Sequence, residues 1–311
     1  MEIKFQNKRG QVITLIALAL IMLLFVSYGI YTTFPNDDGI QKRVKTMDNH
    51  LFSMKQDLER NLYVSGFRTI FLAQTEIANS GTYIENFESF FNESVYNGTV
   101  SGEPKEIMVG ATINDIINSL NQSASKLNLD LHIYNVEVSV GQDNPWNVFV
   151  EMNFTLNLSD KGGLASWYTN ESIKSEIGVE NFEDPLYLIE TSGRVTKQIN
   201  QTIYEGIYTS GSDVSNLLNH LETGYYSAHS DAPSFIDRLE GNLVENENGI
   251  ESFVYVPDLS NQGISVKDKS IVDHIYFSLN NPSTSQVSGM PAWFKIDSTH
   301  ESKYNITSLV I

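Results

Sequence analysis

The chain has 311 residues, no cysteine and a formal net charge of −18. Without cysteine there is no disulfide framework, thiol nucleophile or thiolate metal site, and so acidic a surface disfavours nucleic acid as a partner. The length suffices for one large hydrophobic core or two small ones.

An uncharged apolar stretch near the N-terminus is the first predicted element. No charged residue lies between Gln11 and Asn36, and residues 12–31 supply the roughly 20 apolar positions that a helix needs to cross about 30 Å of hydrocarbon. We therefore expect a transmembrane helix at 11–34, in contact with membrane lipid.

The charges on either side of this helix predict its orientation. Residues 1–9 carry a net charge of +2, because Glu2 is outnumbered by Lys4, Lys8 and Arg9, so the rest of the chain carries −20. Basic flanks stay on the cytoplasmic side of a membrane. The prediction is a single-pass protein of the cell membrane, with a basic cytoplasmic leader at 1–10 and an extracellular domain beyond residue 35.

The junction before the apolar run has a distinctive order of residues. A basic pair, Lys8 and Arg9, is followed by Gly10 and then by Gln11, which opens the run. This junction resembles the class III signal peptide of archaeal type IV prepilins. The resemblance implies cleavage between Gly10 and Gln11 by a prepilin-type peptidase, with the helix kept on the mature chain. An uncleaved signal anchor is the alternative.

The same resemblance implies partners for the N-terminal helix. In pilins this helix leaves the membrane and packs into a filament core, so pilus or surface-assembly proteins and further copies of the chain become expected partners. Small residues at Ala17, Ser27 and Gly29 would let helices approach closely. Many pilins carry a glutamate at the fifth mature position, where this chain has Leu15, and the difference bears on polymerisation more than on cleavage.

Residues 35–80 are predicted to form a juxtamembrane turn and a long stalk helix. Pro35 and the Asn-Asp-Asp-Gly sequence after it favour a turn. Apolar residues then recur at alternating spacings of 3 and 4, which is typical of a helix, up to about Ala78. They begin with Val44, Met47, Leu51, Met54 and Leu58. The stripe would pair with another helix or, more commonly, pack onto the protein's own domain.

Residues 81–160 read as an α+β head with a β-hairpin. Helices are expected at 84–96 and at 112–127, where Thr112 and Asp115 form a capping-box-like start. Strand-like alternation at 129–140 and 146–158, joined by a Gly- and Pro-containing turn, predicts an antiparallel pair.

Residues 161–311 are expected to form a second α+β part, separated from the head by a polar stretch at 160–181. Strands are predicted at 185–189, 250–256 and 271–279, and helices at 213–221 and 233–239. The segments 184–187, 271–277 and 291–297 resemble stretches of uncharacterised archaeal membrane-anchored surface proteins with prepilin-like N-termini. That resemblance implies no activity.

Eight N-glycosylation sequons lie on the expected outer side of the membrane. They are Asn92, Asn97, Asn121, Asn153, Asn157, Asn170, Asn200 and Asn305. Asn153 and Asn157 occupy the polar positions of the strand 146–158, so we expect both to face solvent.

No sequence motif for catalysis or cofactor binding is present. Asp297, His300 and Glu301 form the one compact group that resembles a divalent-metal site, although a solvated loop is the more common reading. His132 and His274 lie in strand-like runs, where an ordinary core or surface histidine is expected. We therefore predict no catalytic, cofactor-binding or metal-ligating residues and no enzymatic activity.

The sequence thus favours a membrane-anchored, pilin-like surface glycoprotein with a structural role in a pilus, surface assembly or adhesion. The alternative is an uncleaved single-pass receptor whose ectodomain binds an unknown ligand.

Overall fold

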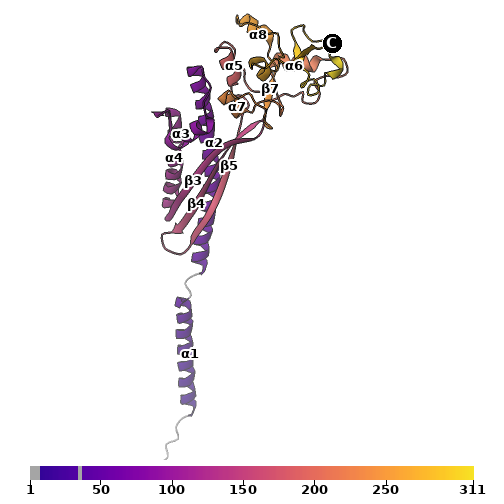
Figure 1. The fold of residues 1–311 in the computed structure, drawn as a ribbon. Helices are drawn as coiled ribbons and strands as arrows, with labels where there is room; N and C mark the ends of the chain where they lie inside the picture. The colour runs from indigo at the N-terminus through magenta and orange to yellow at the C-terminus, as the bar shows by residue number, and fades with distance from the viewer. Residues whose placement is uncertain (1–7, 34–36) are drawn as a thin grey trace, which may run out of the picture.

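The computed structural model describes residues 8–33 and 37–311, and its fold is mixed α+β with antiparallel sheets (Figure 1). The juxtamembrane turn predicted after Pro35 lies partly at residues 34–36, which are outside the described residues. The next helix begins at Asp37.

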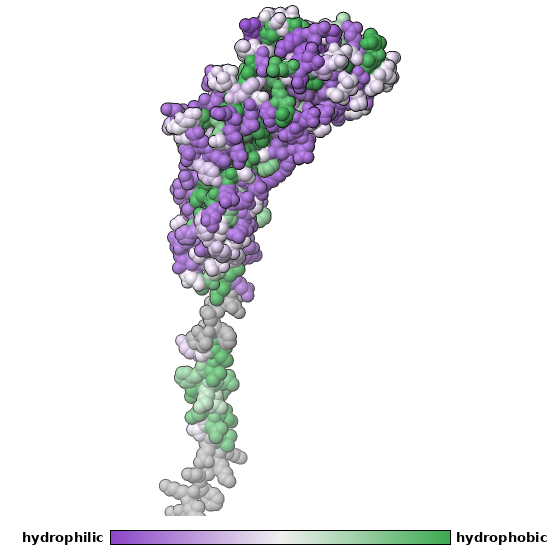
Figure 2. All heavy atoms as spheres, viewed as in Figure 1, coloured by the Kyte–Doolittle hydropathy of each residue, from purple (hydrophilic) through white to green (hydrophobic). Residues whose placement is uncertain are grey.

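Helix α1 (Lys8–Thr33) is the apolar N-terminal helix. Its segment Val12–Ile30 is long and apolar enough to cross a membrane, and none of that segment is buried against the rest of the protein. Leu15 and Phe25 are each 72% exposed. Figure 2 shows hydrophobic residues gathered along α1, whereas hydrophilic residues dominate the visible face of the domain that follows.

Helix α2 (Asp37–Ser80) packs along the largest sheet. Met47, Met54, Leu58 and Leu62 are all buried there. The expectation that the apolar stripe packs onto the protein's own domain is therefore confirmed, and over this length α2 is not a free-standing stalk.

The largest sheet is an antiparallel meander of three strands, β3 (Leu129–Asn144), β4 (Asn147–Asp160) and β5 (Ser166–Gly178). The predicted hairpin is confirmed as β3–β4, with Leu131 opposite Leu158. Helices α2, α3 (Phe87–Asn97) and α4 (Ile113–Lys126) bury the apolar face of this sheet. The capping box between Thr112 and Asp115 is present at the start of α4.

The polar stretch 160–181, expected to separate two subdomains, contains strand β5, which pairs with β4. Ile173 and Ile177 of β5 face the α2 side and are buried, while Lys174 and Glu176 between them are exposed. Because most residues of β5 are polar, the sequence did not predict a strand here.

After β5 the chain forms short elements that gather at the end of the sheet away from the start of α2 (Figure 1). These are α5 (Pro185–Glu190), α6 (Ser215–Thr223), β6 (Tyr226–Ala228), α7 (Phe235–Glu240), β7 (Ile250–Ser252), α8 (Val256–Asn261), α9 (Asp273–Phe277), β8 (Thr284–Gln286) and β9 (Lys295–Asp297). The remaining short elements are β1 (Thr99–Val100), β2 (Glu103–Pro104), η1 (Glu106–Met108) and η2 (Thr307–Leu309). Buried apolar side chains from Leu186 to Ile306 form a second core here.

Three strand predictions in this part need correction. Residues 185–189 form helix α5, because Asp184 caps it through a 2.9 Å hydrogen bond from the Leu186 N–H and Pro185 occupies its first turn. Residues 273–277 form helix α9, whose five residues are all buried, so no apolar periodicity marks it as a helix. The strand expected at 250–256 ends at Ser252, and α8 begins at Val256. The helices predicted at 213–221 and 233–239 are confirmed as α6 and α7.

Candidate functional site

Strand β7 carries two polar side chains into the interior of the C-terminal part. It pairs with β6, and Glu251 and Ser252 point to opposite sides, as successive strand residues do. The turn before β7 needs a glycine, because a Cβ on Gly249 would lie 2.0 Å from the carbonyl oxygen of Ala232. Each of the two side chains joins a separate buried cluster.

Ser252 joins a cluster around Arg238, which is fully buried. The guanidinium donates to Asp184 Oδ2 at 2.7 Å and to Asp273 Oδ1 at 3.1 Å, and Ser252 Oγ donates to Asp273 Oδ2 at 2.7 Å. Burial by itself would raise the pKa of Asp273, but Arg238 holds it well below its usual value. The cluster connects α5, α7, α9 and β7 by pairing one guanidinium with two carboxylates, so it is a structural ion pair network.

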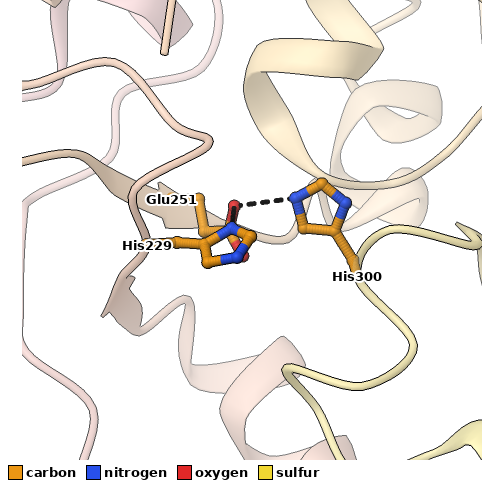
Figure 3. A group of neighbouring side chains, drawn as sticks. All are labelled: His229, Glu251 and His300. Carbon is orange, nitrogen blue, oxygen red and sulfur yellow. Dashed lines mark hydrogen bonds and ion pairs between the residues drawn. The ribbon is translucent and has the colours of Figure 1, made fainter. Parts of the chain in front are cut away.

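Glu251 joins a second cluster, shown in Figure 3, in which two imidazoles face one carboxylate oxygen. Glu251 Oε2 lies 3.1 Å from His229 Nδ1 and 3.0 Å from His300 Nε2. We call His229, Glu251 and His300 the histidine–carboxylate triad. The Glu251 side chain is completely buried, that of His300 is 2% exposed and that of His229 is 16% exposed.

Further hydrogen bonds orient the triad. Asp297 Oδ1 lies 2.7 Å from His300 Nδ1, and Asp297 Oδ2 accepts a 2.7 Å bond from Ser270. Tyr304 donates to Glu251 Oε1 at 2.8 Å, so the other oxygen of Glu251 is left to the two histidines. These contacts hold the donor atoms of Glu251 and His300 in one direction.

The charges in this cluster depend on one another. Burial by itself would raise the pKa of Glu251, but hydrogen bonds from His229 and His300 hold it well below its usual value. Burial would likewise lower the pKa of His300, but Asp297 and Glu251 on its two nitrogens raise it to about 10. The site therefore attracts positive charge.

A surface pocket of about 520 Å³ adjoins His300 and is also lined by His274, Thr299, Asp231 and Glu245. His274 Nδ1 lies 3.5 Å from Asp273 Oδ1, and the His274 and His300 ring centroids lie 5.8 Å apart, so His274 lies between the two buried clusters.

The group Asp297, His300 and Glu301 is not the solvated loop that the sequence suggested. Asp297 and His300 are buried and bonded to each other, and Glu301 is only half-buried and takes no part in the triad. His229 and Glu251 were missed because they lie 22 residues apart, and Glu251 lies 49 residues from His300. Spacings of this size match no local metal motif.

The predicted processing and glycosylation residues lie away from the triad. Gly10 and Gln11 lie in the first turns of α1. Asn97, Asn153, Asn170 and Asn305 are exposed, and the half-buried sequons are Asn92, Asn121, Asn157 and Asn200. The expectation for solvent exposure thus holds for Asn153, whereas Asn157 is half-buried.

Comparisons with known proteins give no relative: no family model, no curated protein and no solved structure matches the chain.

Proposed function

We propose that this chain is a membrane-anchored, pilin-like cell-surface protein with a structural role, exposed outside the cell beyond α1. The observation that carries the proposal is the order of its first two helices. An apolar helix that the protein does not cover is followed closely by a 44-residue helix that packs along an antiparallel meander.

The uncovered surface of α1 supports a hydrophobic partner. Soluble proteins rarely expose contiguous apolar patches of more than a few hundred Å², yet Leu15, Met22 and Phe25 are each more than 60% exposed. Either lipid or neighbouring copies of α1 would cover these side chains. A pilin uses both environments in turn, first the membrane and then the filament core.

A receptor that stays anchored is the second candidate. The presence of Leu15 where many pilins have a glutamate favours the receptor. A pocket of about 420 Å³ also favours it, because lining residues such as Lys197, Glu222 and Tyr255 offer charged and aromatic groups to a ligand.

Fractionation of the native host separates the two candidates. In the structural role the wild-type protein is recovered in sheared surface filaments, and Ala17→Leu reduces that recovery several-fold while leaving membrane insertion intact, because leucine favours insertion but obstructs close helix packing. Ile16→Leu is the matched control, since it adds no bulk at the neighbouring position. Recovery of wild-type protein only from detergent-extracted membranes would favour the receptor.

A further inference from the structure

Three side chains from separate segments of the C-terminal part converge on one point. His229 directly follows β6, Glu251 lies on β7, and His300 follows β9. We propose that this histidine–carboxylate triad binds one divalent transition metal ion, Zn²⁺ by its donor set, and that the ion cross-links the three segments.

The distances between donor atoms suit a metal ion. Metal–ligand bonds of about 2.0–2.2 Å place neighbouring ligand atoms roughly 3–3.5 Å apart. Glu251 Oε2 lies 3.1 Å from His229 Nδ1 and 3.0 Å from His300 Nε2, and all three donor atoms lie within 4.8 Å of one another. Figure 3 shows the two rings meeting at the carboxylate. Small side-chain adjustments are enough to admit the ion.

The hydrogen bonds around the triad have the pattern found around the ligands of metal sites. Ligating histidines commonly give their second nitrogen to a carboxylate, which fixes the ring orientation. Asp297 does this for His300, and Tyr304 holds the Glu251 oxygen that faces away from the histidines. The directions of two donors are therefore set before any ion binds.

The balance of charge favours a dication. Glu251 and Asp297 are two buried carboxylates, and within the described residues their ion pairs are formed by imidazoles alone. A divalent ion that displaces the imidazole protons neutralises both carboxylates, and the two histidines then act as uncharged ligands. Two nitrogens and one carboxylate oxygen are donors typical of Zn²⁺ and unsuited to Ca²⁺ or Mg²⁺.

The position of the triad indicates what the ion does. The chain has no cysteine, and the elements around the triad are strands of three residues that contribute few backbone hydrogen bonds. One ion at the triad closes loops of 22 and 49 residues. It therefore supplies the kind of cross-link that disulfides give other extracellular domains. The pocket beside His300 provides a path from solvent.

The test uses the full-length chain in detergent, stripped with a chelator and titrated with Zn²⁺ by calorimetry and thermal unfolding. We expect one ion per chain and a rise of several degrees in the unfolding midpoint. His229→Gln, at the partly exposed edge of the triad, should weaken binding at least 10-fold and abolish the rise, while Asp297→Asn should weaken binding about 10- to 100-fold. His132→Gln is the matched control, because it removes an exposed histidine far from the triad and should change nothing.

X-ray absorption of the Zn²⁺-loaded wild-type protein gives a result that does not depend on how the variants fold. Two imidazoles and a carboxylate around the ion support the proposal. Oxygen ligands alone, no stoichiometric binding, or binding that survives His229→Gln would each overturn it.

Discussion

His220 shows how burial sets the charge of a single side chain in the second core. The residue is fully buried, Nδ1 bonds Thr202 Oγ1 at 2.9 Å, and the ring lies edge-on to Tyr208 and Phe253. Among the described residues Nε2 has no hydrogen-bond partner. Burial, aided by the charge of Lys197, lowers the pKa of His220 to about 3.

This shift makes stability depend on pH. Below about pH 6.5 His220 is protonated in the unfolded chain but stays neutral in the folded protein. The free energy of unfolding therefore falls by roughly 1.4 kcal/mol for each pH unit between about 6.5 and 3. His220→Asn, which keeps an acceptor for Thr202, lacks this dependence. In urea unfolding at pH 7 and pH 5, the wild type should therefore lose about 2 kcal/mol more than the variant. Equal losses would show that folding does not lower the pKa of His220.

Single residues were the hardest feature to predict from sequence. Asp297 and His300 stood out because they are three positions apart, but the third member of the cluster, Glu251, lies 49 residues before His300 on β7. Residues far apart in the sequence are brought together only by the tertiary fold, so local spacing cannot predict which of them will form a cluster.

Among the elements, those with a regular row of apolar residues on one buried face were predicted well. Helix α4 and strand β4 each bury alternate or periodic positions, and that periodicity is visible in sequence. Helix α9 is buried on all sides, so its apolar run looks the same as that of a strand. Strand β5 carries so many polar residues that only Ile173 and Ile177 signal its buried face.

The packing of α2 on the sheet depends on one close approach. A Cβ on Gly66 would lie 2.5 Å from Ile177 Cδ1 and 2.6 Å from Val150 Cγ2. Gly66→Leu should therefore force α2 away from β4 and β5 and lower the free energy of unfolding by about 1–3 kcal/mol or more. Ser53→Leu places the same side chain at an exposed position of α2 and should change stability by less than about 0.5 kcal/mol. Denaturant unfolding of both variants tests this, and equal stability would contradict the close contact.

At the scale of the whole molecule, the apolar helix and the acidic domain form two distinct surfaces (Figure 2). In the proposed membrane-anchored protein, the basic residues before α1 predict the direction in which α1 would cross the membrane. Protease added to intact cells should thus attack the chain only beyond about residue 35, and permeabilised cells should also lose the leader. Protection of the C-terminal part in intact cells would reverse the proposed orientation.

Mass spectrometry of the N-terminal peptide of the native protein, purified from its own membranes, tests the pilin-like proposal most directly. Processing between Gly10 and Gln11 predicts a mature chain that begins at Gln11 and starts within α1. Replacing Gly10 with a bulky residue should leave the precursor uncleaved. An intact Met1 on the wild-type protein, in cells that process their other pilins, would contradict the proposal.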